Sequence, residues 1–396
     1  MAQEGTFTFA VVGGGLVGLT TALALAGSIS KHNQRIALIA PTAEIPDGRT
    51  TALLMPSIEF LEKLGVWEVC KPHSAPLRTM RLVDGTKRLI RAPLTDFKAA
   101  ELALEAFGYN VPNAIMISEL SELIDRHPSI TRIDTTAKEV VHGEVGATLH
   151  LDNGEQIDAE YLAACDGKNS KLRQAAGIET RLWDYPQTAL VLTFTHNLPH
   201  NDVSTEFHTE TGPFTQVPLP ANDTATQRSS LVWVVTPEQA ETLLAKGQSE
   251  LEGIIEQKMH SYLGKITLEG APQSFPLSGM TAKCFADNST FLLGESAHVF
   301  PPIGAQGFNL GLRDIIALTK TLEEHGIDNK QQILAAYHAQ RTADVHLSTG
   351  AVDILNRSLL ADFLPVQAAR AFGLAAVGQL GWLRKMVMKR GLAPTT

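Results

Sequence analysis

Apolar and polar positions at the beginning of the chain follow the order strand, turn, helix, strand. Residues 7–12 are an apolar run rich in β-favouring side chains, residues 15–26 have helical spacing, and residues 35–40 form a second apolar run. Two strands joined through a helix begin a parallel βαβ unit. The pattern therefore predicts a Rossmann-like α/β domain in this part of the chain.

The middle of the chain changes to strand patterns. Residues 131–164 alternate apolar and polar positions around a tight-turn signal at residues 152–154, which predicts a small antiparallel meander. Further strands are predicted at residues 188–195, 203–208, 214–219 and 230–236. This block carries no cofactor motif, so we expect it to form a substrate domain.

Helical patterns follow the predicted strands. Pro237, at a position tolerated in a first helical turn, opens a predicted helix that extends to about residue 263. The chain also has helical character from residue 310 to its end. Its last 34 residues, from Phe363 on, contain five basic residues and no acidic one.

Composition narrows the class of protein. The chain has 396 residues, of which 44% are hydrophobic and 19% charged, as in a soluble globular protein of two or three domains. A net charge of −9 argues against nucleic acid as a partner, because phosphate binding needs a basic face. The longest weakly polar run, residues 371–383, is shorter than the ~20 residues that cross a bilayer.

Cysteine usage indicates a reducing compartment. Cys70, Cys165 and Cys284 are the three cysteines, and none of them has the Cys-x-x-Cys spacing. We therefore expect reduced thiols in a cytoplasmic protein, and no metal site is predicted.

A glycine motif connects the first predicted strand to the first predicted helix. In Gly13-x-Gly15-x-x-Gly18, the first glycine permits a tight turn, the second lets a diphosphate approach the backbone, and the third lets the helix pack closely. The diphosphate would lie at the positive end of the helix dipole. By itself the motif also fits a glycine-rich turn without a ligand.

One residue that usually accompanies this motif is absent. An acidic side chain at the end of the second strand normally binds ribose hydroxyls, and Ala40 stands in its place. Glu44 or Asp47 could substitute for it.

Two later segments have no counterpart in a simple NAD-binding domain. The first spans residues 165–173 and the second spans residues 294–314. With them the chain resembles the class A flavoprotein monooxygenases, and most of all the ubiquinone-biosynthesis hydroxylases. The residues that match the two family motifs are Asp166, Gly167, Ser170 and Arg173, and then Gly294, Ala297, His298, Pro302, Gln306, Gly307, Asn309, Gly311 and Asp314. Further similar segments are residues 49–53, 64–67, 212–214, 218–220, 231–233 and 275–277.

The resemblance implies an α/β fold (α+β mixed) with three parts: a Rossmann-like FAD-binding domain, an inserted antiparallel-sheet substrate domain, and a helical C-terminal region. The expected boundaries are residues 1–72, 100–180 and 280–330 for the first part, 73–99 and 181–279 for the second, and 331–396 for the third.

The resemblance also implies the residues that bind FAD. They are Gly13, Gly15, Gly18, Arg49, Asp166, Gly294, Glu295, Pro302, Gly304, Ala305, Gly307 and Asn309. Two of them depart from the family pattern, since Glu295 replaces an aspartate and Ala305 replaces a glycine. The N-terminus of a helix that begins near Phe308 would point at the pyrimidine edge of the flavin. His298 is interpreted as a packed structural histidine, and Arg49 as a flavin or substrate contact or else a solvated loop residue.

The reaction that the resemblance implies has two halves. An external donor, NAD(P)H, reduces the flavin; the reduced flavin adds dioxygen at C4a, and this hydroperoxide hydroxylates a prenylated phenol of ubiquinone biosynthesis. A base near the phenol would help, but the sequence assigns no residue to that role.

The basic C-terminal segment, residues 363–390, suggests contact with a membrane surface, because a prenylated substrate resides in the membrane. Leu380, Leu383 and Val387 share one helical face there. Packing of this helix on the FAD-binding domain is an equal alternative, and a complex with other proteins of the quinone pathway is a further expectation.

Two other functions remain open at this point. One is a different flavoenzyme on the same fold, such as a halogenase or a prenyl reductase, although Trp233-Val234-Val235 does not match a halogenase motif. The other is an FAD-binding accessory or reductase-type flavoprotein of a membrane-lipid pathway that does not turn over as a hydroxylase.

Overall fold

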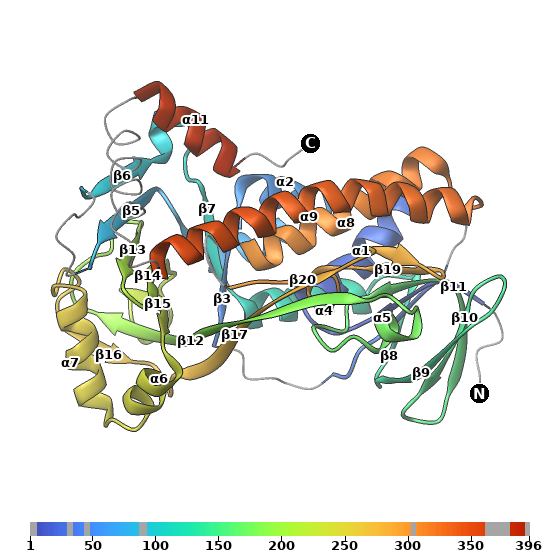
Figure 1. Cartoon of the computed structure of the whole chain (residues 1–396), viewed down its shortest axis with the longest axis horizontal. Helices are drawn as coiled ribbons and strands as arrows, with labels where there is room; N and C mark the ends of the chain where they lie inside the picture. Colours follow the sequence, from blue (N-terminus) through green and yellow to red (C-terminus); the bar gives the residue numbers. More distant parts are fainter. Residues whose placement is uncertain are drawn as a thin grey trace.

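A computed structural model describes residues 6–29, 35–42, 48–86, 93–301, 306–360 and 381–392. The molecule is elongated, with one large sheet toward each end and long helices along one side (Figure 1). Helices and several sheets mix as expected, which confirms the predicted α/β class.

The first sheet has eight strands, and its centre is parallel. Along it the order is β18-β19-β11-β1-β2-β8, with β10 and β9 continuing from β11. Its strands are β1 (Phe7–Val12), β2 (Ile36–Ile39), β8 (Ile130–Ile133), β9 (Ala137–His142), β10 (Ala147–Leu151), β11 (Gln156–Ala164), β18 (Ala286–Asp287) and β19 (Thr290–Leu292). Every residue of β1 and β2 is buried, as in a parallel sheet covered on both faces.

The predicted βαβ unit and meander are both confirmed. Helix α1 (Leu16–Ile29) connects β1 to its parallel neighbour β2. Strands β9, β10 and β11 form the antiparallel meander, and β11 also pairs in parallel with β1. Ala159 of β11 belongs to both pairings, because it lies opposite Ala147 of β10 and Phe7 of β1.

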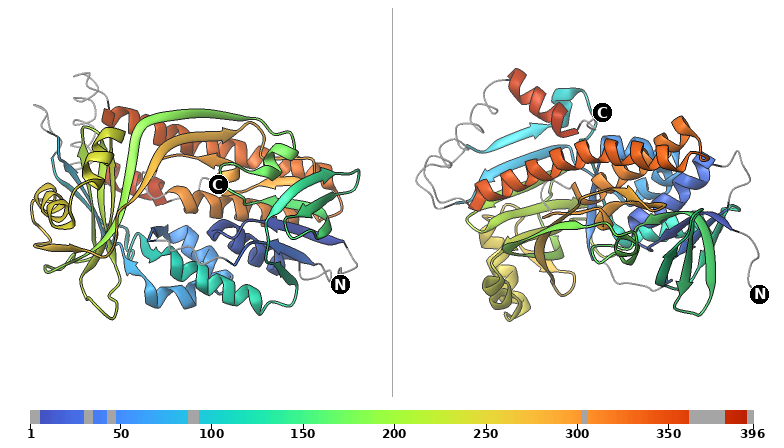
Figure 2. Two further views of the ribbon diagram at one scale, coloured as in Figure 1. Left: turned by 90° about the horizontal axis from the view of Figure 1, so that it is seen from below. Right: turned by 45° about the vertical axis from the view of Figure 1, so that its right-hand side comes forward.

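The second sheet has nine strands and is mainly antiparallel. Its order is β20-β17-β12-β15-β14-β13-β5-β6, with β16 beside β12. The strands are β5 (Thr79–Asp84), β6 (Thr95–Lys98), β12 (Thr180–His196), β13 (Val203–Thr209), β14 (Gly212–Leu219), β15 (Arg228–Val235), β16 (Ile266–Leu268), β17 (Gln273–Ala282) and β20 (His298–Val299). The long strand β12 runs along much of the molecule between the two halves (Figures 1 and 2).

A third, small sheet lies between the other two. It consists of β3 (Thr50–Leu54), β7 (Gly108–Pro112) and β4 (Ala75–Pro76). The helices and 3-10 turns between residues 55 and 175 are α2 (Met55–Lys63), α3 (Val66–Cys70), η2 (Lys71–His73), η3 (Ala99–Leu102), α4 (Asn113–Asp125) and α5 (Lys171–Ala175). Within this group α3 packs against both α2 and α4, and α4 in turn contacts α1.

The helix expected between Pro237 and residue 263 is wrong as a single element. Two helices are present, α6 (Pro237–Leu244) and α7 (Gln248–Lys258). Thr236 and Gln239 form a reciprocal capping box at the start of α6. Gly247, which caps α7, has extended backbone (φ −66°, ψ 154°), and this conformation separates the two helices.

The C-terminal part is helical, as expected, in separate pieces. These are α8 (Gln306–His325), α9 (Lys330–Leu360) and α11 (Gly381–Leu392). Gly326 separates α8 from α9 with a left-handed backbone (φ 69°), which favours glycine. Within the described ranges no helix combines the length and apolar character that a membrane span requires.

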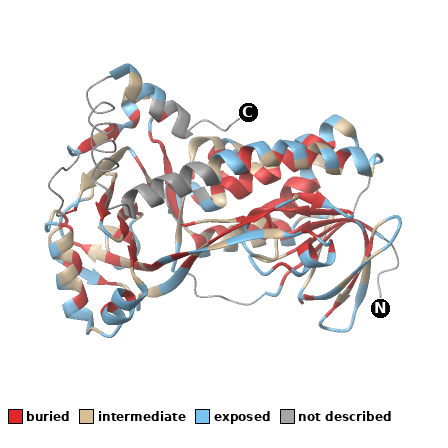
Figure 3. Cartoon of the chain, viewed as in Figure 1, coloured by how far each residue is buried: buried red, intermediate tan, exposed pale blue. Residues whose placement is uncertain are grey.

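The two faces of the second sheet have different neighbours. On one face Leu231, Trp233 and Val235 of β15 join an apolar core with residues of α6 and α7. On the other face the Ser230 hydroxyl lies 3.1 Å from the Thr50 hydroxyl of β3. Buried residues follow the strands of both halves and the inner side of α8 (Figure 3). The face that carries Ser230 therefore looks toward the small third sheet, which contains β3.

Candidate functional site

Three motifs meet at one edge of the parallel sheet. Ala164, near the end of β11, is paired with Val12 at the end of β1 and with Leu292 at the end of β19. The glycine turn, the segment that begins at Cys165 and the segment that begins at Gly294 all follow within two residues of this row. Ligands of open α/β sheets bind at the carboxyl ends of the strands. The topology thus brings together segments that are far apart in the sequence.

The first and third glycines of the turn are required by packing. Gly13 has φ 129°, and a Cβ at this position would lie 2.1 Å from the Cys165 carbonyl oxygen. A Cβ at Gly18 would lie 2.0 Å from the Gly13 carbonyl oxygen. These contacts hold the beginning of α1 close to β1 and β11.

The second glycine has a different environment. Gly15 is exposed, and a Cβ built on it meets no atom within 4 Å. Protein packing therefore does not explain the glycine at this position. An open space beside backbone N–H groups at a helix N-terminus is suited to a phosphate group.

The two carboxylate oxygens of Asp166 differ in their hydrogen bonds. Its Oδ2 accepts hydrogen bonds from the Lys171 and Leu172 N–H groups, at 2.8 and 3.3 Å, at the start of α5. Its Oδ1 is buried without a hydrogen-bond partner among the described residues. A buried acceptor of this kind is costly unless it is paired, and a ligand hydroxyl group would satisfy it.

Arg173 connects the second motif to the third. Its side chain is buried and donates to the Ser296 carbonyl oxygen and to the Lys168 carbonyl oxygen, both at 2.8 Å. Burial lowers the pKa of this guanidinium, although Asp166 opposes the effect. Because both contacts are made to backbone oxygens, Arg173 fixes the relative position of the two segments.

The third motif places small residues against α1. Gly294 has a left-handed backbone (φ 63°), and a Cβ there would lie 2.9 Å from the Val17 side chain. A Cβ at Gly311 of α8 would lie 2.8 Å from the same side chain. Val17 thus fills a groove that the two glycines create. Next to Gly294, the Glu295 carboxylate is exposed at the same edge as Gly15.

A buried ionic network supports this motif from behind. The Asp314 carboxylate accepts hydrogen bonds from the Gly294 N–H and Arg341 Nε, and it lies 2.8 Å from His298 Nε2. Arg341 also contacts Asp344. Burial alone would raise the pKa of the Asp314 carboxyl, but His298 and Arg341 outweigh it, so the pKa lies below its ordinary value. His298 is 3% exposed and packs inside this network, which supports its interpretation as a structural histidine.

Asn309 holds the first turn of α8 in place. Its Oδ1 accepts hydrogen bonds from the Leu54 N–H at 3.0 Å and the Ser57 hydroxyl at 2.7 Å. Its Nδ2 donates to the Ala52 carbonyl oxygen at 2.8 Å. The sequence motif suggested a cofactor contact, and the structure shows in addition a tie between α8 and β3.

Arg49 lies at the junction between the two large sheets. Its guanidinium carbon is 5.6 Å from the centre of the Phe275 ring on β17, and its backbone carbonyl accepts a hydrogen bond from the Asn113 N–H. Phe275 is 36% exposed, which is unusual for such a large apolar side chain. With the Thr50–Ser230 contact nearby, this pair marks an accessible place between the halves.

Several predicted site residues lie outside the described residues. These are Pro302, Gly304 and Ala305, together with the alternative ribose contacts Glu44 and Asp47. Gly307, in the first turn of α8, is described and exposed. The described part of the chain has no cluster of three or more histidine, cysteine or acidic residues that could hold a metal ion.

A carboxylate that the sequence pattern does not reveal lies near the end of β2. Ala40 is buried and has no acidic group to offer, but Asp134 follows the adjacent strand β8. Its Oδ1 accepts a hydrogen bond of 2.8 Å from the Thr42 N–H, and the hydrogen bonds from Thr42 lower its pKa. Only the parallel pairing of β2 with β8 reveals that this exposed acid lies at the same sheet edge.

Comparisons with known proteins agree with this geometry. The family model described as FAD binding domain matches residues 6–349. The chain is 30% identical to the ubiquinone hydroxylase UbiL of Rhodospirillum rubrum, over 96% of this chain and 88% of that protein. It is 29% identical to the 3-demethoxyubiquinol 3-hydroxylase of Escherichia coli, over 97% of each chain.

Solved structures of low sequence identity have the same fold. The p-nitrophenol 4-monooxygenase PnpA of Pseudomonas putida superimposes with a TM-score of 0.80 at 16% identity, over all of both chains. HpxO of Klebsiella pneumoniae, in complex with FAD and uric acid, gives a TM-score of 0.78 at 16% identity, over 99% of this chain and 98% of that chain. The chain belongs to the FAD-binding family of ubiquinone-biosynthesis hydroxylases and is an FAD-dependent monooxygenase.

Proposed function

We propose that the chain hydroxylates the aromatic ring of a prenylated phenol on the route to ubiquinone, with dioxygen as co-substrate and NAD(P)H as the external reductant. The observation that carries the proposal is the similarity to ubiquinone hydroxylases over 96% of the chain, which includes the junction between the two sheets. When bound, FAD supplies the activation of dioxygen; the protein supplies binding, orientation and exclusion of water.

Each motif has a proposed role toward FAD. The turn at Gly15 and the N-terminus of α1 hold the diphosphate, because the first turn of a helix leaves N–H groups without intrahelical partners and the space at Gly15 is open. Asp166 Oδ1 and the Glu295 carboxylate accept hydrogen bonds from hydroxyl groups of the cofactor. Asp134 binds the ribose hydroxyl groups in place of the acid that is absent at Ala40.

The remaining predicted residues are assigned to the ring end of the cofactor. Gly307 borders the flavin ring, and the N-terminal dipole of α8 favours negative charge on its pyrimidine edge. Asn309 positions that helix end through its contacts to the segment 52–57. Arg49 and Phe275 then border the space in which the substrate ring meets the flavin.

Activity with a defined substrate tests this proposal. The purified protein should be yellow, and with NAD(P)H, a prenylated phenol and ¹⁸O₂ it should release a phenol that contains one ¹⁸O atom. A flavoprotein that consumes NAD(P)H without labelling the ring would favour the accessory or reductase function. A colourless protein that FAD cannot reconstitute would contradict the flavin assignment itself.

The pathway is tested in the cell. Deletion of the gene should cause one quinone precursor to accumulate, and its structure would identify the ring carbon that is hydroxylated. An unchanged quinone pool would count against ubiquinone biosynthesis. A complex with other enzymes of that pathway stays a prediction.

Helix α11 supports contact with a membrane surface. The helix packs against β6 and η3, not on the FAD-binding sheet: Arg384 donates to Glu101 Oε1 at 2.7 Å, and Met388 joins an apolar cluster with Phe97. Trp382 and Met386, one turn apart, remain 68% and 49% exposed. Leu380 and the Val387 side chain, from the predicted apolar face, lie outside the described residues, and Leu383 is half-buried.

We expect the double variant Trp382→Ala, Met386→Ala to bind anionic lipid vesicles several-fold more weakly than the unaltered protein. An exposed tryptophan is suited to the lipid–water interface, and basic residues nearby add an attraction of ~1 kcal/mol each. Co-sedimentation with vesicles measures the effect, and Leu182→Ala, which removes an exposed leucine of β12 (64% exposed), is the matched control. Equal sedimentation of all three proteins would contradict membrane contact through α11.

A further inference from the structure

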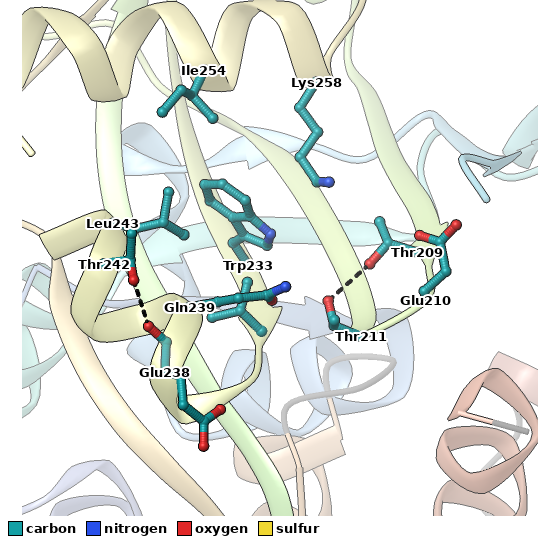
Figure 4. Close-up of a pocket in the computed structure, with 11 residues that line it drawn as sticks. Thr209, Glu210, Thr211, Trp233, Glu238, Gln239, Thr242, Leu243, Ile254 and Lys258 are labelled. Carbon is teal, nitrogen blue, oxygen red and sulfur yellow. Dashed lines mark hydrogen bonds between the residues drawn. The ribbon is translucent and has the colours of Figure 1, made fainter. Parts of the chain in front are cut away.

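The second sheet carries a cavity on the face that turns away from the FAD-binding half. It has a volume of about 470 Å³ and lies between β15, the turn that connects β13 to β14, and helices α6 and α7 (Figure 4). None of the residues of the three flavin motifs lines it. The cavity is therefore a place separate from the candidate flavin site.

Trp233 forms the floor of this cavity and supplies a buried donor. The residue is 5% exposed, and its ring packs edge-on against Phe214 with ring centres 5.4 Å apart. Its Nε1 is buried without a hydrogen-bond partner in the part of the chain that the structure describes. Figure 4 shows this nitrogen pointing into the cavity. A buried N–H group is normally paired, so the geometry calls for an acceptor from outside the protein.

Two further donors, from different elements, line the same cavity. The Lys258 ammonium of α7 lies 5.4 Å from the centre of the Trp233 ring. The Gln239 side-chain oxygen accepts a hydrogen bond from the Thr236 N–H, and its amide nitrogen points toward the cavity (Figure 4). An indole N–H, an amide and an ammonium together form a donor set that suits a carboxylate.

Two other polar side chains at the cavity already donate hydrogen bonds within the protein. The Thr209 hydroxyl donates to the Gly212 carbonyl oxygen at 2.7 Å, and the Thr211 hydroxyl donates to the Val234 carbonyl oxygen at 3.1 Å. In Figure 4 the Glu238 carboxylate points away from the indole nitrogen, and Glu210 lies beyond Thr209. Lys258 brings one positive charge to the cavity lining, which suits a ligand with a single carboxylate.

The rest of the lining is apolar. Val235, Leu243 and Ile254 face the cavity from β15, α6 and α7. We propose that the cavity binds a small organic monocarboxylate, with the carboxylate at Trp233 Nε1, the Gln239 amide and Lys258, and with its apolar body against Leu243 and Ile254. The site is a second ligand site on the substrate half and takes no part in the chemistry at the flavin.

Binding of octanoate and benzoate to the flavin-loaded protein tests the proposal, with octanol and benzamide as neutral counterparts. Isothermal titration calorimetry should show saturable 1:1 binding of at least one carboxylate, at least tenfold tighter than its neutral counterpart. Trp233→Phe keeps an aromatic ring but removes the N–H, and we expect it to weaken binding about tenfold. Lys258→Gln should have a similar or larger effect.

Lys265→Gln, at an exposed lysine that does not line the cavity, is the matched control and should bind like the unaltered protein. The use of two separate variants protects the test against a folding defect in either one, and circular dichroism checks each fold. Absence of saturable binding overturns the proposal. Binding that persists in both Trp233→Phe and Lys258→Gln but disappears when a prenylated phenol is added places the probe at the flavin, and this also overturns it.

Discussion

Replacement of Gly15 by leucine is expected to give a folded protein that purifies without flavin. A Cβ at Gly15 meets no protein atom within 4 Å, so the variant should keep the stability of the apoprotein. The larger side chain would instead fill the space beside the N-terminus of α1, where the diphosphate is proposed to lie. The visible absorbance spectrum, per mole of protein, measures flavin retention directly.

Two other glycines provide the controls for this experiment. Gly253→Leu, at an exposed helical position with no neighbouring atom, should retain flavin in full. Gly13→Ala should fail differently, through loss of folded protein, because φ is 129° and the new Cβ would collide with the Cys165 carbonyl. Stoichiometric flavin in Gly15→Leu would show that the diphosphate lies elsewhere.

The second large effect is expected at Asp314. Its exchange for asparagine should lower the free energy of unfolding of the apoprotein by roughly 3 kcal/mol, because removal of one member of a buried ionic network leaves the other charges poorly compensated. Urea-induced unfolding, followed by circular dichroism, gives this value. Glu179→Gln, which breaks an exposed pair with Lys283, should lower the free energy of unfolding far less, because solvent screens that pair. Similar losses in the two variants would show that the buried network contributes no special stability.

The Asp314 network also predicts how stability depends on pH. The pKa of Asp314 is lower in the folded protein than in the unfolded chain, so its contribution is fully present above the unfolded value of about 4. That contribution is lost as the pH falls through the lower, folded value. Unfolding midpoints of the unaltered protein and of Asp314→Asn should therefore differ most near neutrality and converge in acid.

Much of this site could be predicted from the sequence because its signals are local. Gly18 is required by a contact within its own turn, and the Asp166 and Gly294 segments each combine a strand end with a fixed loop. The strand predictions near residues 203–236 also agree with β13, β14 and β15, since alternation along a strand depends only on its two faces. The domain boundaries remain our proposal.

What the sequence could not provide depends on contacts between distant segments. The tie of Asn309 to the strand β3 joins residues more than 250 positions apart, and the motif alone suggested only a cofactor contact. Asp134 reaches the site through strand pairing, which no local pattern reveals. The break at Gly247 was missed because a single glycine is compatible with both a continuous helix and a helix cap.

Strand β12 has a mechanical consequence for the whole molecule. Its 17 residues pair with β17 along Thr180–Asp184 and Thr188–Val191 and with β15 along Thr188–Thr195, so one strand extends between the two halves. The ladder with β17 is interrupted between Asp184 and Thr188, where Pro186 offers no backbone N–H. We expect any rotation of the substrate half relative to the flavin half to bend β12 between Asp184 and Thr188, while the strand on either side keeps its shape.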